Sequence, residues 1–243
     1  MPSCSAVCID LFNTLVNVGD VPDTVGRFTA DVLGIDRDVW NAVCFGPDHE
    51  ICRPTVHADI LRTLAHSIDP AIPLERITEA ARERQARFDH ALCNVKAGTL
   101  DTLRELRRAG FRLALISNAS TGEVAAWSDS PLAPMFDVTL FSCECGYKKP
   151  EPEIYQHALR RLGLSAHECL YVGDGGSQEF HGASQAGFHT VLTREFLKPA
   201  RYQRVMAEQG QMIGTEIAAI QELLELLGYK TGTGKAGPGD EPS

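Results

Sequence analysis

The sequence lacks any long run of apolar residues. No part of the 243-residue chain approaches the roughly 18 to 20 uninterrupted apolar residues that a membrane-spanning helix needs. The N-terminal segment MPSCSAVCID has no basic region ahead of an apolar run and a small-residue cleavage site, so it does not match a secretory signal peptide. We therefore expect a soluble protein that makes no membrane contact and stays in the cytoplasm.

Positive charge is also scarce, because 23 Lys and Arg face 32 Asp and Glu and give a formal net charge of −9. Nucleic-acid-binding surfaces usually carry a basic stripe, so nucleic acid is not an expected partner. The charge runs at 36–38 and 82–87 lack the interleaved aromatic residues of a nucleic-acid groove and are typical of solvated helix faces. The remaining composition, 44% hydrophobic and 23% charged, is that of an ordinary globular protein.

The eight cysteines follow no regular spacing. Most of them lie in apolar segments, which favours reduced thiols buried in a core. Cys143 and Cys145 form a C-x-C pair, but no second pair and no histidine cluster accompanies them. Since structural zinc sites combine four such ligands, we do not expect zinc.

Five short apolar segments predict strands of a parallel sheet, because each is partly β-branched and stops abruptly at a polar residue or a glycine. They lie at 6–9, 111–116, 138–141, 169–172 and 189–192. Helical patterns at 100–107 and 154–162 precede Gly110 and Gly163, and glycine is a common helix terminator. Strands that alternate with helices predict a Rossmann-like, doubly wound α/β fold.

The segment 17–94 interrupts this alternation with helical periodicity alone. We assign it to a helical cap inserted into a Rossmann-like core made of residues 1–16 and 95–228. A last helix is predicted from one apolar face and stops at Gly228; the face consists of Ile217, Ile220, Leu223, Leu224 and Leu227. The tail 229–243 is rich in Gly, Pro and charge, which predicts disorder.

Ligands of such sheets bind at the carboxyl ends of the strands. Asp10, Ser117 and Asp174 close three of the predicted strands, so we expect them to meet at one edge. Each residue alone has a simpler explanation, since Asp and Ser commonly cap helices and Gly-Asp is common in turns. Their combination with other motifs favours a functional site.

Four short motifs stand in an order that resembles the haloacid dehalogenase superfamily. They are Asp10-x-x-x-Thr14, Ser117-Asn118, Lys149-Pro150, and Gly173-Asp174 followed by Glu179. The resemblance covers residues 6 to about 195. The context at 146–155 looks like the lysine segment of the family and assigns the family's lysine to Lys149 rather than Lys148.

The resemblance implies that Asp10 attacks a phosphoryl group and forms an aspartyl-phosphate that is then hydrolysed. Transfer of a phosphoryl group needs neutralisation of its developing negative charge. Ser117, Lys149 and a Mg²⁺ ion are expected to share this task. Thr14 and Asn118, the latter through its backbone, are expected beside the substrate.

The metal site that the resemblance implies is built from oxygen ligands, as Mg²⁺ prefers. Asp10, the carbonyl oxygen of Phe12 and Asp174 would bind the ion, and Glu179 would hold a coordinated water. Lys149 has a second expected role, because its charge keeps neighbouring carboxylates ionised that would otherwise repel each other.

Phe12 departs from the phosphatase pattern of this superfamily, which usually has a second aspartate two residues after the nucleophile. A phenyl ring can neither protonate a leaving oxygen nor activate water, and general acid catalysis contributes about 10²- to 10⁴-fold. Aromatic residues at this position resemble the superfamily's metal-independent 2-haloacid dehalogenases.

Three interpretations therefore remain. The chain is a Mg²⁺-dependent phosphohydrolase acting on a small phosphorylated metabolite, a 2-haloacid dehalogenase, or a non-catalytic member that binds a ligand or partner. Asp174 favours the first, because an acidic cluster without a cation would repel an anionic substrate.

The predicted cap would exclude water and recognise the non-reacting part of the substrate. Its arginines at 27, 53 and 62 can in principle clamp an anionic group, and Trp40 and Phe45 can pack on an apolar one. Each is better explained as a surface charge or as part of the cap core, so the sequence does not name a substrate.

Overall fold

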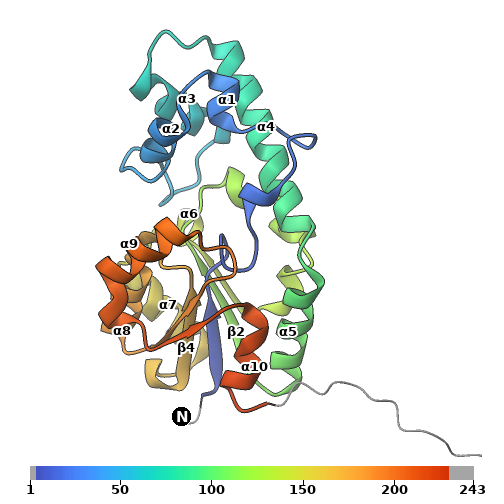
Figure 1. Ribbon diagram of the computed structural model, residues 1–243, viewed down its shortest axis with the longest axis vertical. Helices are drawn as coiled ribbons and strands as arrows, with labels where there is room; N and C mark the ends of the chain where they lie inside the picture. The colour runs from blue at the N-terminus through green and yellow to red at the C-terminus, as the bar shows by residue number, and fades with distance from the viewer. Residues whose placement is uncertain (1–3, 230–243) are drawn as a thin grey trace, which may run out of the picture.

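The structure is a computed structural model that describes residues 4–229. It consists of a helical body, drawn at the top of Figure 1, and a larger α/β body below it. The long helix α4 (Leu74–Cys93) runs from the helical body down toward the α/β body and is followed there by α5 (Ala97–Arg108).

The α/β body is built on one six-stranded sheet in the order β3-β2-β1-β4-β5-β6. Its strands are β1 (Ala6–Ile9), β2 (Arg112–Ser117), β3 (Val138–Phe141), β4 (Cys169–Gly173), β5 (His189–Thr193) and β6 (Thr215–Ile217). All neighbouring strands are parallel. The chain moves outward from β1 to β3 and then crosses to β4 on the other side of β1, which confirms the predicted doubly wound α/β class.

Alternating side chains of the strands build two separate cores. On one face, Val7 and Ile9 belong to a cluster that is closed by α5 and α10 (Leu223–Leu226). On the other face, Cys8 belongs to a cluster closed by α7 (Pro152–Leu162) and α8 (Glu179–Ala186). The sheet is thus covered by helices on both sides, as a parallel sheet requires.

The C-terminal part differs from its prediction. Ile217 does not lie in a helix; it ends β6, where it pairs with Thr193 of β5. Helical structure begins only at Ile220, with a 3-10 turn that leads into α10. The apolar period of 217–227 fits a helix, but pairing with an otherwise open sheet edge overrides local periodicity over the first three residues. The helix α9 (Pro199–Gln209) was also not predicted.

Short elements complete the fold. They are the helix α6 (Ser142–Cys145) and the 3-10 turns η1 (Val18–Asp20), η2 (Gly122–Val124), η3 (Trp127–Asp129), η4 (Ala133–Met135), η5 (Ala166–Glu168), η6 (Gly176–Gln178), η7 (Gly210–Met212) and η8 (Ile220–Glu222). Tyr229 packs edge-on against Phe111, with ring centroids 5.6 Å apart. The rest of the tail predicted to be disordered lies outside the described residues.

The helical body contains α1 (Thr29–Leu33), α2 (Arg37–Cys44), α3 (His57–Ile68) and α4. Its own apolar cluster includes Trp40, Leu61 and Ile77. The residues that carried the helical prediction, among them Ile60, Leu64 and Ala80, are buried there. This body is the helical cap of the predicted fold class, while the boundaries at 17 and 94 stay a prediction.

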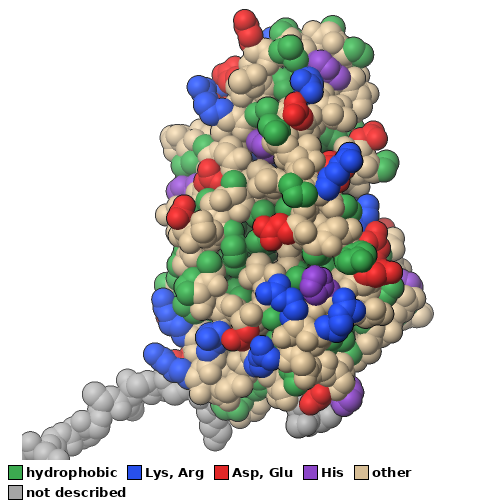
Figure 2. Space-filling model, turned by 180° about the vertical axis from the view of Figure 1, so that it is seen from behind, with side chains coloured by type: hydrophobic (Ala, Val, Ile, Leu, Met, Phe, Trp, Pro, Cys, Tyr) green, Lys and Arg blue, Asp and Glu red, His purple; other side chains and the backbone are tan. Residues whose placement is uncertain are grey.

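No helix within residues 4–229 is both long and apolar enough to cross a membrane. All eight cysteines lie in that range and are free thiols. On the face shown in Figure 2, acidic and basic side chains are both spread from the cap to the core.

Arg87 of α4 binds the backbone of the segment 18–28, which leads from the core into the cap. Its guanidinium is buried and donates hydrogen bonds to the carbonyl oxygens of Gly26 (2.6 Å) and Val18 (2.9 Å). It also stacks on the ring of Phe28 at 4.0 Å. Since buried carbonyl groups need donors, one side chain satisfies the backbone at two points of this segment.

Replacing Arg87 by Met should therefore destabilise the protein by about 3 kcal/mol, because it leaves two carbonyl groups without their charged donor. Urea unfolding measures the loss. Arg82→Met on the same helix is the matched control, since the Arg82 side chain is 76% exposed, and a surface change of this kind costs about 0.5 kcal/mol or less. Equal losses in both variants would contradict the role given to Arg87.

Candidate active site

The site lies at the carboxyl ends of β1, β2 and β4, which are neighbours in the sheet. Asp10 follows β1, Ser117 ends β2 and Asp174 follows β4. The strand order reverses here, and this is the position where open α/β sheets bind ligands. The expectation that these three residues meet at one edge agrees with the structure.

The turn after β1 holds the Asp10 carboxylate in a fixed orientation. The Asp10 backbone N–H donates to the carbonyl oxygen of Val172 on β4 at 2.9 Å. Asn13 adopts a left-handed conformation with φ 59°, which turns the chain sharply. The hydroxyl of Thr14 then donates to Oδ2 of Asp10 at 3.0 Å. Thr14 is fully buried, so in this structure its side chain positions the carboxylate.

Lys149 lies between two carboxylates. Its Nζ atom is 2.5 Å from Oδ1 of Asp10 and 2.7 Å from Oε2 of Glu179, and all three side chains are buried. Burial by itself would lower the pKa of Lys149, but the charges of Asp10 and Glu179 outweigh it and raise the pKa above its usual range. Lys149 is therefore a permanent cation beside Asp10.

The side chain of Asn118 holds the backbone of Lys149. Its Nδ2 donates to the carbonyl oxygen of Lys149 at 3.0 Å, and its Oδ1 accepts from the Lys149 N–H at 2.7 Å. The Asn118 amide thus joins the end of β2 to the segment before α7. Ser117 is buried, and its hydroxyl makes only a long contact of 3.5 Å, to the Asn118 carbonyl oxygen.

Glu179 is fully buried and its two oxygens are engaged. Oε1 accepts from the backbone N–H of Gly175 at 2.8 Å. Oε2 accepts from Lys149 and from the hydroxyl of Tyr171, the latter at 2.8 Å. A Cβ at position 173 would lie 2.1 Å from Oε1, so Gly173 is needed for this close approach. Burial raises the pKa of Glu179, and Lys149 opposes that rise.

Asp174 is buried and faces Arg201 of α9. Nη2 of Arg201 lies 2.8 Å from Oδ2 of Asp174, while Oδ1 accepts from the backbone N–H of Gly176 at 2.8 Å. Burial, and next the charge of Glu179, raise the pKa of Asp174 to about 7, although Arg201 acts in the opposite direction.

The acidic residues fit a divalent cation in part. Asp10, Asp174 and Glu179 each offer a carboxylate oxygen, and these atoms lie within 4.8 Å of one another. Oδ2 of Asp174 is buried and accepts no aligned hydrogen bond from the described residues, although it forms the ion pair with Arg201. Asp10 and Asp174 line the cavity and Glu179 does not, so Asp10 and Asp174 are the two carboxylates best suited to direct ligation.

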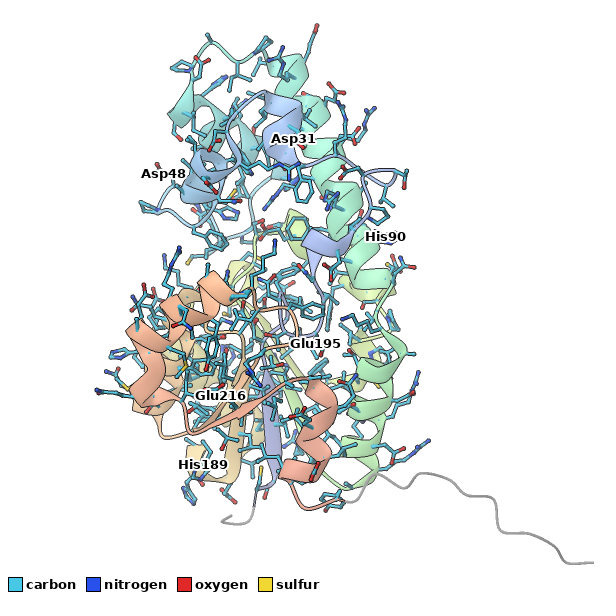
Figure 3. All side chains as sticks on the ribbon, viewed as in Figure 1. Asp31, Asp48, His90, His189, Glu195 and Glu216 are labelled. Atoms are coloured by element: carbon cyan, nitrogen blue, oxygen red, sulfur yellow. The ribbon has the colours of Figure 1, made fainter. Side chains whose placement is uncertain are left out.

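A cavity of about 810 Å³ lies between the cap and this edge of the sheet. Asp10, Lys149 and Asp174 line it from the core, and Trp40 and Phe88 line it from the cap. In Figure 3, the labelled Asp31 and Asp48 lie in the cap and Glu195 lies in the core. The cavity encloses enough space for a small-molecule ligand.

Phe12 is part of the contact between core and cap. Its ring packs edge-on against Phe88 of α4, with centroids 5.2 Å apart. Arg84 lies over the other aromatic ring, Phe88, at 4.6 Å. Position 12 therefore adds apolar surface next to Asp10, where a carboxyl group would add a proton donor.

The arginines considered as cap clamps do not line the cavity. Arg27, Arg53 and Arg62 pair with acidic neighbours on the cap itself, namely Glu79, Glu50 and Asp59. Trp40 and Phe45 do line the cavity. Trp40 is at the same time buried in the cap core, whereas Phe45 is exposed.

Three contributors were missed at the level of sequence. Tyr171 lies within β4 and was indistinguishable from core, Arg201 lies on an unpredicted helix, and Glu123 follows the second motif without a pattern of its own. Glu123 is buried in η2 and pairs with Arg84 of the cap at 2.5 Å. Arg84 is 39 residues earlier in the chain, so no local sequence pattern could have predicted this contact.

The fold and the site define a Rossmann-like enzyme class in which an aspartate at the end of the first strand faces a lysine and an acidic motif. Residues 4–187 match the model of the haloacid dehalogenase-like hydrolases. The chain belongs to this family.

Curated relatives match over part of their length. The chain is 31% identical to glyceraldehyde 3-phosphate phosphatase of Methanothermobacter thermautotrophicus over 140 residues. This region covers 56% of this chain and 60% of that protein. It is 32% identical to (S)-2-haloacid dehalogenase of Pseudomonas sp. strain YL over 140 residues. This region covers 57% of this chain and 56% of that protein. The chain thus matches little more than half the length of these relatives.

Solved structures share the fold. A dehalogenase with an intermediate complex has a TM-score of 0.69 at 22% identity, covering 95% of this chain and 100% of that one. A β-phosphoglucomutase homologue from Thermotoga maritima has a TM-score of 0.66 at 20% identity, covering 92% and 98%. Both likenesses concern the arrangement of the elements.

His57 gives the contact between cap and core a pH dependence. Its ring lies against η2, so that a Cβ at position 122 would be 2.2 Å from Nδ1. Both ring nitrogens are buried and have no hydrogen-bond partner among residues 4–229. Burial, and next the charge of Arg84, lower the pKa of His57 from 6.5 to about 4.

Because the pKa of His57 is lower in the folded state, the unfolded chain binds a proton first as the pH falls below about 6.5. Stability is fully present above that pH and is lost as the pH approaches 4. Between about pH 7.5 and about pH 5, wild type should lose about 2 kcal/mol more than His57→Leu. Urea unfolding at the two pH values tests this, and parallel losses in both proteins would show that His57 does not titrate as described.

Proposed function

We propose that this protein is a Mg²⁺-dependent phosphohydrolase that acts on a small phosphorylated metabolite through an aspartyl-phosphate formed on Asp10. The observation that carries the proposal is the pair of buried carboxylates, Asp10 and Asp174, facing one cavity with Lys149 between Asp10 and Glu179. The match to a glyceraldehyde 3-phosphate phosphatase supports phosphoryl chemistry. Location in the cytoplasm remains the expectation from the sequence.

Asp10 is prepared for nucleophilic attack. Thr14 holds Oδ2 and Lys149 holds Oδ1, which fixes the direction of the carboxylate. Attack by one oxygen forms a bond to phosphorus while the bond to the leaving oxygen breaks. Water then hydrolyses the aspartyl-phosphate and releases inorganic phosphate, which restores Asp10.

Lys149 and Ser117 would bind the phosphoryl oxygens. The ammonium group of Lys149 lies beside Asp10, and the hydroxyl of Ser117 ends the neighbouring strand. Both positions are fixed before the substrate arrives, and fixed charges and donors of this kind favour the developing negative charge. Asn118 supports the arrangement by holding the Lys149 backbone.

A Mg²⁺ ion would be held by Asp10, Asp174 and the carbonyl oxygen of Phe12, with Glu179 outside the direct ligands. When bound, such an ion neutralises phosphoryl charge and orients the transferred group. Glu179 does not line the cavity, and its contact with Lys149 favours a role in holding that lysine over direct coordination.

Dehalogenation of a 2-haloacid is the second candidate function. Phe12 favours it, because an aromatic group next to the nucleophile suits an apolar leaving group that needs no proton. The match to an (S)-2-haloacid dehalogenase supports the same alternative. Asp174 argues against it, since the carboxylate cluster that it forms with Asp10 and Glu179 suits a divalent cation, which metal-independent dehalogenation does not need.

Phosphate release from p-nitrophenyl phosphate and acetyl phosphate, and halide release from 2-chloropropionate, separate the two functions. We expect phosphate release with Mg²⁺, loss of this activity with EDTA, and background rates for Asp10→Asn. Asp129→Asn is the matched control, because Asp129 is an exposed carboxylate at η3 of the core. Halide release that persists in EDTA would establish the dehalogenase instead, and inactivity toward all three compounds would favour a binding protein.

Phe12 predicts a preference for phosphates whose leaving group needs no proton, such as acyl or anomeric phosphates. Phe12→Asp should therefore raise turnover of alkyl phosphates, by up to the roughly 10²- to 10⁴-fold that a general acid supplies. Phe12→Leu removes the aromatic contact with Phe88 and adds no acid, so it should give no such gain. Steady-state rates on alkyl and acyl phosphates measure the difference. Failure of a folded Phe12→Asp variant to gain, or an equal gain in Phe12→Leu, would contradict the assignment.

A further inference from the structure

Arg201 brings a positive charge to the acidic site from outside the four motifs. It lies on α9, after β5, and its guanidinium reaches back to the residue that follows β4. The side chain of Arg201 is 35% exposed and that of Asp174 is 3% exposed. Arg201 also lines the cavity, so its guanidinium borders open space as well as the carboxylate.

The contact falls on the oxygen of Asp174 that is best suited to a metal. Oδ1 of Asp174 already accepts the backbone N–H of Gly176. Oδ2 is buried, accepts no aligned hydrogen bond from residues 4–229, and has Nη2 of Arg201 at 2.8 Å. A divalent cation bound to Oδ2 would lie within a few ångströms of the guanidinium, and two like charges at that distance repel strongly.

Arg201 is also the ion-pair partner of the one carboxylate in the cluster that Lys149 does not contact, Asp174. The cluster holds three carboxylates, and Lys149 contacts two of them, Asp10 and Glu179. Arg201 contacts the third. A buried carboxylate without a counter-charge is costly, so the guanidinium stabilises the metal-free site.

We propose that Arg201 is a built-in competitor of the divalent cation: it neutralises Asp174 in the metal-free protein and must withdraw from Oδ2 when the cation binds. This inference rests on the metal site of the proposed function. Arg201 is a positioning residue here, since it acts through Asp174. The guanidinium weakens metal binding. In the metal-free protein it also reduces the repulsion between Asp174 and the other two carboxylates.

The first test measures metal affinity without substrate. Isothermal titration of Mn²⁺ into Arg201→Met should give a Kd about tenfold lower than in wild type, as expected when one partly exposed charge near a ligand is removed. Arg204→Met removes the same charge from an exposed position of the same helix. It should change the Kd by about twofold or less, since exposed charges are screened.

The second test measures thermal stability in EDTA and in Mn²⁺. Arg201→Met should melt below wild type in EDTA, because Asp174 loses its counter-charge, and should gain more from Mn²⁺ than wild type does. Asp174→Asn should remove the Mn²⁺-dependent gain in both backgrounds. A purely structural role for Arg201 would lower the melting temperature and leave the Mn²⁺ affinity unchanged, which would overturn the proposal.

The outcomes also separate this inference from the proposed function. If wild type binds Mn²⁺ through Asp174 and Arg201→Met binds it no more tightly, the competition is wrong and the metal site stands. If binding is detectable only in Arg201→Met, the competition is supported in its strongest form. If neither protein binds Mn²⁺, both the metal site and the competition are wrong.

Discussion

Lys149 lies between Asp10 and Glu179, at 2.5 Å and 2.7 Å, and the geometry of the whole edge of the sheet depends on this buried contact. Two carboxylates at this distance would repel each other without a cation between them. Asn118 fixes the backbone of the lysine, Thr14 fixes the aspartate, and Gly175 and Tyr171 fix the glutamate. Asn118 and Glu179 therefore act on Asp10 through one ammonium group, whereas Thr14 contacts Asp10 directly.

The contact also explains why the acidic motif is divided into two roles. Glu179 uses both of its oxygens within the protein, so it supports Lys149. Asp174 shares the motif but faces the cavity, where its ion-pair partner among the described residues is Arg201. Lys149 and Arg201 thus offset part of the negative charge of the three carboxylates, and any cation that enters does so against a guanidinium already in place.

The cap and the core meet through a few specific contacts beside this site. Phe12 packs on Phe88, Arg84 pairs with Glu123, and His57 lies against η2. Because Phe12 lies two residues after Asp10, the residue that decides whether the site has a general acid is also a residue that seats the cap. A change at position 12 alters the chemistry and the cap contact together.

The sequence by itself determined the alternation of short strands and helices, the inserted helical segment, and the meeting of Asp10, Ser117 and Asp174, because parallel strands bring their carboxyl ends to one edge. Tertiary structure decided the rest. Ile217 lies in a strand because it pairs with the edge of β5. Asn118 holds the Lys149 backbone because the two residues lie side by side. Arg201 reaches Asp174 because α9 lies near the end of β4. Such contacts join residues far apart in the chain, and local periodicity carries no information about them.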